Sequence, residues 1–327
     1  MHYLLKRILY AIPVLIGVNL ITFVLFFMVN SPDDMARMQI GGKYTSEAAI
    51  QNWKIQNGYD YPYFYNEKVS GINSLTKTLF YRKSMSLFTF QFGLSNQGRD
   101  ISQDIFVRMR PSIALAIPTL VFSLTLNILI ALFTALFQNS FFDKAVRLAC
   151  IALISISSLF FIFLGQLLVG KIFQWVPISG YQSGISAFKF LLLPILIGVI
   201  ASLGSGIRWY RTIFLEEMGR DYVRTAKAKG LSDFTILINH VLENGLIPIL
   251  TGVVVIIPTL FLGSLIMESF FGIPGLGSYT LDAIQQQDFE IVRAMVFLGT
   301  LFYILGLLLT DLSYLWVDPR VRLGESS

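Results

Sequence analysis

Residues 221–231 read D-Y-V-R-T-A-K-A-K-G-L and lie between two apolar runs, 190–207 and 248–267, that contain no Asp, Glu, Lys or Arg. Each charge at the centre of a bilayer costs about 2.5–3.5 kcal/mol, so this basic segment belongs in water. An apolar run of about 18 residues or more is long enough to span the hydrocarbon core as a helix. The segment therefore separates two predicted membrane spans of a polytopic membrane protein.

The composition of the whole chain agrees with this class. Apolar residues make up 54% of the 327 residues and charged residues 14%, whereas a soluble domain carries roughly 25% charged residues. The sequence predicts an all-α polytopic membrane protein with six transmembrane helices. These are Ile8–Asn30, Pro111–Phe137, Leu148–Gly170, Phe190–Ile207, Pro248–Met267 and Ala294–Trp316.

Two of these runs have features of their own. The first is expected to stay as an anchor, because its apolar core exceeds the roughly 7–15 residues of a cleaved signal and no A-x-A-like site follows it. The last contains Asp311. A carboxylate inside a span is tolerated near the interface or against protein, and Asp311 is expected in one of these places.

The distribution of Lys and Arg predicts the orientation. Basic residues beside the spans gather on the side of the two termini, while the short loops opposite contain only Lys171, Lys189 and Arg293. By the positive-inside rule, both termini and residues 221–231 are cytoplasmic. The chain is therefore predicted to have three parts. Residues 1–30 form the N-terminal tail and the first helix, residues 31–110 form an extracytoplasmic insert, and residues 111–327 form a permease core. The core contains helices 2–6 and a cytoplasmic loop at 211–246.

Within the insert, Thr45–Asn57 has the polarity and apolar spacing of a short helix. Tyr residues then alternate at positions 59, 61, 63 and 65. The alternation fits a strand with one aromatic face, and it fits equally an aromatic belt at the membrane interface.

The cytoplasmic loop is predicted to form two short helices. Asp221 can cap the first helix, and Gly230 is placed to end it. Ser232 and Asp233 can cap a second helix, Phe234–Leu242. Four side chains of the first helix share one face at helical spacing: Tyr222, Val223, Ala226 and Lys229. The loop could lie on anionic headgroups, or it could bind a partner protein.

After the fifth run, residues 268–277 read E-S-F-F-G-I-P-G-L-G. Pro274 and the glycines after it cannot continue a helix, so the chain turns or re-enters the membrane here. Glu268 is expected at the external interface, paired or hydrated. The segment is either a helix terminator or part of an outer gate.

The sequence indicates no catalytic or metal site. There is no G-x-x-x-x-G-K-[ST] phosphate loop, and the nearest string, at 41–44, lacks the first Gly and the Ser/Thr. His2 and His240 are the two histidines, and neither has ligand partners at metal spacing. Cys150 is the one cysteine, which excludes an intrachain disulfide. The net charge of +5 follows from the loop asymmetry, so it gives no reason to expect nucleic acid.

Several segments resemble ABC importer permeases of the oligopeptide, dipeptide and nickel class. The loop R-D-Y-V-R-T-A-K-A-K-G-L resembles the cytoplasmic loop of that family, with Arg224 at its Glu position. Four other elements match in the same order: K-R-I-L-Y-A-I-P-V at the start, F-G-L-S at 92–95, W-V-P-I-S-G-Y at 175–181 and D-P-R-V-R at 318–322. The segment at 268–277 resembles the family's E-x-x-F-x-x-P-G-L-G signature. The second run lacks the Gly and Pro expected near its end, and Asn66–Arg82 resembles nothing.

The resemblance implies a type I ABC importer permease fold in the bacterial inner membrane. It implies a second homologous permease subunit, two ATPase subunits that use ATP and Mg, an extracytoplasmic solute-binding protein and surrounding lipid, with no cofactor on this chain. It implies a coupling helix that binds the ATPase through Asp221, Tyr222, Arg224, Thr225, Ala226, Lys227, Ala228, Lys229, Gly230 and Leu231. An outer gate or partner contact would involve Glu268, Phe271, Pro274, Gly275 and Gly277.

The expected function is therefore that of a permease that imports oligopeptides or dipeptides and carries no enzymatic activity itself. Nickel or another small solute is the alternative cargo. An ion-coupled transporter is disfavoured, because such proteins usually keep ionisable groups at mid-membrane and show inverted repeats. A membrane scaffold would not need the coupling loop.

Overall fold

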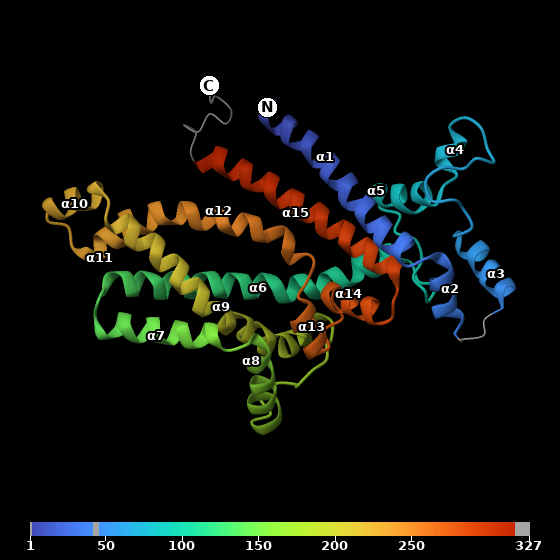
Figure 1. Ribbon diagram of the computed structural model, residues 1–327. Coiled ribbons are helices and arrows are strands. Elements are labelled where there is room, and N and C mark those ends of the chain that lie inside the picture. The colour runs from blue at the N-terminus through green and yellow to red at the C-terminus, as the bar shows by residue number, and fades with distance from the viewer. Residues whose placement is uncertain (1, 42–45, 318–327) are drawn as a thin grey trace. The chain divides into compact units, whose positions relative to one another are not determined.

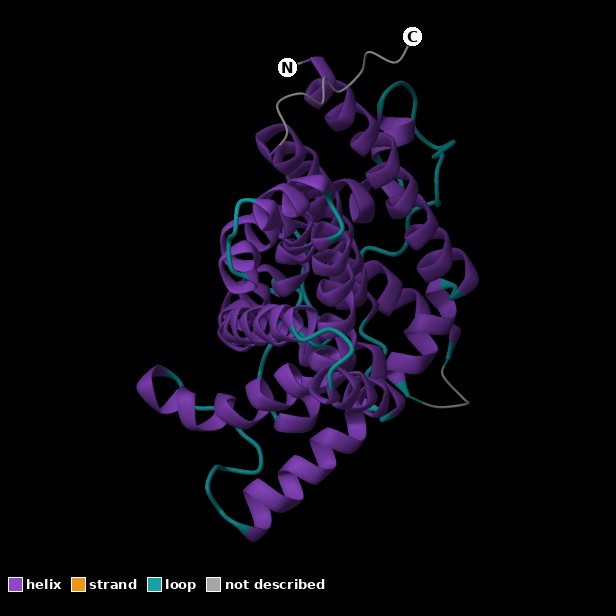
Figure 2. Cartoon of the chain, turned by 90° about the vertical axis from the view of Figure 1, so that its left-hand side faces the viewer, coloured by secondary structure: helices purple, strands orange, loops and turns teal. Residues whose placement is uncertain are grey.

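The computed structural model describes residues 2–41 and 46–317, and within these ranges the chain is helical (Figures 1 and 2). A single antiparallel bridge between Leu94 and Asp100 is the β contact found there. Five helices are long and apolar enough to cross a membrane, or six if one bent pair counts as a span. The all-α polytopic prediction is confirmed. The segment at 318–322 lies outside the described residues.

The chain divides into two compact units, each with its own core. Unit 1 comprises residues 1–106 and 282–304, and unit 2 comprises residues 107–281 and 305–327. The insert was expected as a part of its own, 31–110. In the structure it shares unit 1 with the first helix and the beginning of the last one. The difference is due to aromatic packing, which joins segments far apart in the chain.

Unit 1 begins with α1 (His2–Phe23), which continues as the π-helical segment η1 (Val24–Val29). The insert adds α2 (Pro32–Ile40), α3 (Glu47–Asn57), α4 (Asn73–Thr76), η2 (Tyr81–Met85) and α5 (Ser86–Phe88). The buried core of unit 1 is formed by Phe23, Phe27, Met35, Tyr59 and Leu79.

The short helix predicted over 45–57 is confirmed as α3. Ser46 caps it by accepting a hydrogen bond from the Ala49 N–H, and Gly58 ends it in the left-handed conformation. The alternating tyrosines form no strand. They lie in an irregular segment in which Tyr59 is buried and Tyr65 is exposed.

Unit 2 is built on long helices. The main ones are α6 (Ile101–Leu136), α7 (Phe141–Ser155), α9 (Ala187–Met218) and α12 (Glu243–Leu260), and α7 packs against α9. Shorter elements are α8 (Ser158–Gly165), η3 (Gln166–Ile172), η4 (Gly184–Ser186), α10 (Asp221–Ala228), α11 (Asp233–Ile236), η5 (Leu237–Leu242), α13 (Leu265–Phe271) and α14 (Leu276–Gln285). The last helix is α15 (Phe289–Val317), whose Asp311 is buried.

The third apolar run, predicted as one straight span, is sharply bent. Helices α7 and α8–η3 meet at 91°. Ile156 is extended at the corner, and Ser157 caps the next helix by accepting a hydrogen bond from the Leu159 N–H. Serine side chains compete for backbone hydrogen bonds in this way, and they can end one helix and start another even within an apolar run.

Two other span boundaries also differ from the prediction. Helix α6 starts at Ile101, before the predicted start at Pro111, because Pro111 is accommodated inside the helix. Helix α12 ends at Leu260 instead of Met267, where Gly263 turns the chain with a φ of +74°. The predicted fifth span is therefore divided by a turn, and α13 follows it.

A buried ion pair joins α7 to α9. Asp143 is fully buried and accepts two hydrogen bonds from Arg211, from Nε and Nη2, each at 2.9 Å. Arg147 approaches the same carboxylate at 3.5 Å and is 45% exposed. The geometry with Arg211 is bidentate and shielded, whereas the contact with Arg147 is at the surface.

Arg211→Met is therefore expected to destabilise the protein by roughly 3–5 kcal/mol, because it leaves a buried carboxylate without its main partner. Arg147→Met should cost under about 1 kcal/mol, as is usual for an exposed pair. Thermal unfolding of both purified variants in the same detergent measures the difference. Equal losses would contradict the assignment of Arg211 as the main partner.

Candidate functional site

The first candidate site is the helix pair α10 and α11, which projects at the end of unit 2 where α6 and α7 are connected (Figure 1). Helix α10 spans Asp221–Ala228. The prediction that Asp221 caps it is wrong: the capping position is Arg220, which is extended and makes no side-chain cap bond. Asp221 occupies the first helical turn instead, where its charge still favours the helix dipole.

The inner face of α10 fixes the helix on unit 2. Val223 and Ala226 are buried, in one apolar cluster with Phe214 of α9 and Ile236 and Val241 of the following helices. Four side chains were predicted to share one face of α10. Val223 and Ala226 form its buried face, whereas Tyr222 and Lys229 are exposed. This apolar cluster packs α10 against α9 and against the segment that leads into α12.

The turn between the two helices has the predicted form. Gly230 has a φ of +83°, its N–H donates to the Lys227 carbonyl at 2.9 Å, and the Leu231 N–H donates to the Ala226 carbonyl at 3.3 Å. Ser232 caps the second helix by accepting from the Thr235 N–H at 3.2 Å. The second helix runs from 233 to 242 and continues directly into α12.

The outer face of α10 and the turn after it are exposed and largely polar. The exposed residues are Asp221, Tyr222, Arg224, Thr225, Lys227, Ala228, Lys229, Gly230 and Leu231. Tyr222 donates a hydrogen bond to Glu217 at 2.6 Å. Burial, together with the Glu217 carboxylate, raises the pKa of Tyr222 well above its usual range, so the hydroxyl remains a donor. A short, anchored helix with a polar outer face is suited to docking against a protein.

The second candidate site is the turn that surrounds Glu268. Its carboxylate is completely buried and accepts hydrogen bonds from Ser112 Oγ at 2.7 Å, from the Ser264 N–H at 3.1 Å and from the Ser278 N–H at 3.0 Å. Ser112 Oγ in turn accepts from the Leu276 N–H at 2.8 Å. The carboxylate thus ties α6, α13 and the start of α14 together.

Glycines allow this close packing. A Cβ at Gly275 would lie 2.3 Å from a Glu268 oxygen, and one at Gly277 would lie 2.5 Å from the backbone carbon of Ser264. Phe271 is buried, and its carbonyl accepts a hydrogen bond from the Gly180 N–H at 2.7 Å. The turn predicted at Pro274 is present, and the structure brings the segments at 175–181 and 268–277 into contact.

The serines at 112, 264 and 278 were missed by sequence reasoning. Ser112 lies 156 residues from Glu268 along the chain, and no spacing rule connects them. Arg293 was treated as a loop cation, which is wrong: it is 2% exposed, in the first turns of α15.

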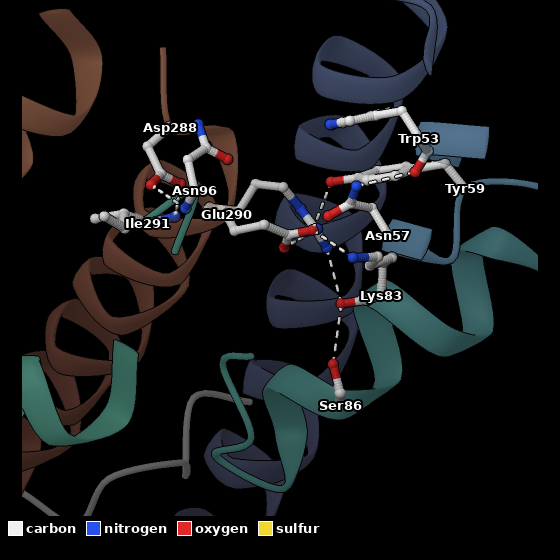
Figure 3. A network of polar contacts seen from close by, with 10 residues as sticks. Trp53, Asn57, Tyr59, Lys83, Ser86, Asn96, Asp288, Glu290 and Ile291 are labelled. Atoms are coloured by element: carbon white, nitrogen blue, oxygen red, sulfur yellow. Dashed lines mark hydrogen bonds and ion pairs between the residues drawn. The ribbon is translucent and has the colours of Figure 1, made fainter. Parts of the chain in front are cut away.

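Arg293 belongs to a buried polar network in unit 1. Figure 3 shows Tyr59, Lys83 and Glu290 of this network. The Glu290 carboxylate accepts hydrogen bonds from Lys83 Nζ at 2.7 Å, from the Tyr59 hydroxyl at 2.8 Å and from Arg293 Nη1 at 3.0 Å. Arg293 also donates to the Lys83 carbonyl at 2.8 Å. Burial, reinforced by the Glu290 charge, raises the pKa of Tyr59 well above its usual range. The network joins the insert to α15 within unit 1.

Comparison with known proteins gives consistent matches. The family model for the binding-protein-dependent transport system inner membrane component matches residues 127–323, and the model for the N-terminal part of such membrane components matches residues 1–89. A putative peptide transport system permease protein of Brucella abortus (strain 2308) is 31% identical over 98% of this chain and 98% of its own length.

Two further relatives match over nearly their whole length. The probable D,D-dipeptide transport system permease protein DdpB of Escherichia coli (strain K12) is 28% identical over 95% of this chain and 94% of its own. The dipeptide transport system permease protein DppB of Bacillus subtilis (strain 168) is 29% identical over 99% of each chain.

Proposed function

Since this chain belongs to the family of binding-protein-dependent transport system inner membrane components, we propose that it forms half of the translocation pore of an ABC importer for oligopeptides or dipeptides. As a member of this family, the chain is a multi-pass permease of the inner membrane. It is a component without catalytic activity that works with an ATPase and a binding protein. The names of the relatives support peptides as the cargo.

The observation that carries the proposal is the construction of α10. Its inner face is fixed by Val223 and Ala226, its outer face is exposed and polar, and Gly230 turns the chain into the helix that becomes α12. Two separate ATPase subunits would bind ATP and Mg, and this chain would bind neither. When an ATPase closes, it moves α10, and the anchored helix passes the displacement to the membrane helices as a rigid lever.

The proposed orientation follows from charge. Basic residues gather around α10, namely Arg220, Arg224, Lys227 and Lys229, and by the positive-inside rule they support a cytoplasmic position for this end of unit 2 and for both termini. The turn around Glu268 then belongs to the external side, where it would act as an outer gate or contact the second permease subunit. Glu268 and Phe271 are buried, so they would act by holding the turn in shape. Apolar side chains exposed on the long helices would contact lipid.

Reconstitution tests the proposal. The chain is co-expressed with a second permease and two ATPase subunits, placed in liposomes, and supplied with the binding protein, ATP and a labelled dipeptide or tripeptide. Uptake that requires ATP and binding protein is expected, and the chain alone should hydrolyse no ATP. Uptake of nickel without peptide uptake would contradict the cargo. Failure of any ATPase subunit to co-purify would contradict the coupling role of α10.

Orientation is measured separately. Reporter fusions after Gly180 and after Lys229 are expected to report outside and inside respectively. A cytoplasmic reporter after Gly180 would contradict the proposed topology.

A further inference from the structure

The contact between α7 and α9 in unit 2 is fixed at two levels. At one level, Asp143 of α7 accepts the two hydrogen bonds of 2.9 Å from Arg211 of α9. At the other, the Cys150 carbonyl oxygen lies 3.0 Å from the place that a Cβ at Gly204 would occupy. Residue numbers rise along α7 and fall along α9 between these contacts, so the helices run in opposite directions. We call the interval between the two contacts the α7–α9 seam.

Two arginines lie on opposite sides of the α7–α9 seam. Arg147 of α7 and Arg208 of α9 each lie about one helical turn from the contact residues of their own helix, and positions three or four apart share a helix face. Arg208 also interacts electrostatically with Cys150 of α7. Both arginines are exposed. Two guanidinium groups therefore come to the surface at the same level of the seam.

Cations outnumber carboxylates at this seam. Asp143 is already engaged by Arg211, and Arg147 approaches it only at 3.5 Å, beyond ordinary hydrogen-bond range. Among the described residues, Arg208 and the neighbouring exposed Lys144 form no ion pair. Like charges held side by side repel each other, so the seam favours an anion from outside the chain.

Guanidinium groups suit one kind of anion in particular. Each presents a planar fork of N–H donors that matches two phosphate oxygens, and basic positions between membrane helices on the cytoplasmic side bind anionic lipid headgroups. We infer that the α7–α9 seam binds the phosphate of an anionic phospholipid through Arg147 and Arg208.

The surroundings favour a lipid over free phosphate. Arg208 follows directly on the uncharged run 190–207, at the level where a membrane helix meets the headgroups. Leu148 and Ile151, which follow Arg147 on α7, are 70% and 53% exposed, so acyl chains can cover them. Trp209 is 64% exposed, and tryptophan is enriched at the membrane interface. A free phosphate would gain nothing from these apolar side chains.

Lipid binding is measured on the complex of this chain with its partner subunits, purified in a neutral detergent. Phosphatidylglycerol, phosphatidylcholine and inorganic phosphate are titrated separately, and native mass spectrometry counts the bound lipid while thermal unfolding reports stabilisation. Phosphatidylglycerol is expected to bind about ten times more tightly than phosphatidylcholine, a difference equal to one charge-assisted hydrogen bond. The measurement needs no transport, so it does not depend on the proposed cargo.

Single substitutions identify the site. Arg147→Gln and Arg208→Gln should each weaken phosphatidylglycerol binding about tenfold, because each removes one guanidinium from the phosphate. Arg208→Lys should lie between Arg208→Gln and the wild type, because it keeps the charge and loses the planar fork. Lys189→Gln is the matched control. It also removes one exposed cation from α9, at the opposite end of the helix, and should leave binding unchanged.

Four results would overturn the inference. The first is equal binding by Arg208→Gln and Lys189→Gln. The second is equal stabilisation by inorganic phosphate, which would leave no role for the lipid. The third is binding by the chain alone that disappears in the complex, because a partner subunit would then cover the seam. The fourth is a lower unfolding temperature of Arg208→Gln without lipid, because removal of a repelled charge should not destabilise the protein.

Discussion

Gly230→Pro is expected to abolish solute uptake while the chain remains inserted and the ATPase subunits continue to hydrolyse ATP. Proline is confined to a φ near −65°, whereas Gly230 has a φ of +83°. Proline also lacks the N–H that donates to the Lys227 carbonyl at 2.9 Å. The turn between α10 and α11 would be rebuilt, and α10 would no longer transmit its displacement to α12.

Other substitutions at Gly230 provide a graded control. A Cβ there meets nothing within 4 Å, so the cost of a side chain is conformational and not steric. Gly230→Asn should retain most uptake, because asparagine tolerates the left-handed region. Gly230→Ala should fall between the two, with a strain of about 1–2 kcal/mol. Uptake and ATP hydrolysis are measured in the same proteoliposomes, and unchanged uptake by Gly230→Pro would count strongly against the coupling role.

Gly277→Ala is expected to prevent most of the protein from folding, so that little folded protein is found in the membrane. The new Cβ would lie 2.5 Å from the backbone carbon of Ser264 and 2.7 Å from the Leu265 nitrogen. Backbone atoms cannot rotate away as a side chain can, so α13 would have to move. Overpacking of this kind typically costs about 1–3 kcal/mol, and more where the backbone shifts. The amount of folded protein and its thermal unfolding in detergent measure the effect.

Gly252→Ala is the matched control, because a Cβ at this position in α12 meets nothing within 4 Å. It should be neutral or stabilise by about 0.5–1 kcal/mol, as expected in a helix interior. Glu268→Ala should resemble Gly277→Ala, because it leaves Ser112 and two backbone N–H groups without their acceptor, at about 1–3 kcal/mol each. If Gly277→Ala unfolded at the same temperature as Gly252→Ala, the packed turn would not be essential to the fold.

The two regions differ in how they depend on the rest of the chain. The α10–α11 turn is stabilised by hydrogen bonds within a few residues, such as those made by Gly230, Leu231 and Ser232. The turn around Glu268 is stabilised by contacts with distant segments, through Ser112 and Gly180. The first could be predicted from the sequence almost completely, except that Arg220 and not Asp221 is its capping residue.

Sequence reasoning also predicted the apolar helices and α3, because their causes are local or compositional. A run of apolar residues favours hydrocarbon wherever it lies. Ser46 begins α3 through its side-chain hydroxyl, and Gly58 ends it through its left-handed backbone. It did not predict the 91° bend after Ser155. The bend cannot be predicted from hydropathy, because the serines and Ile156 at the corner interrupt the helix without interrupting the apolar run.

What the sequence determined by itself is therefore the solvent that each segment requires and the points where helices start and stop. Transfer of apolar side chains and charges between water and lipid is a property of each segment, and capping is a property of a few neighbouring residues. The tertiary structure alone decided which polar groups are buried together. Glu268 with Ser112 and Glu290 with Lys83 both join residues far apart in the chain. Their stability depends on hydrogen bonds in a water-poor interior, and no local pattern carries that information.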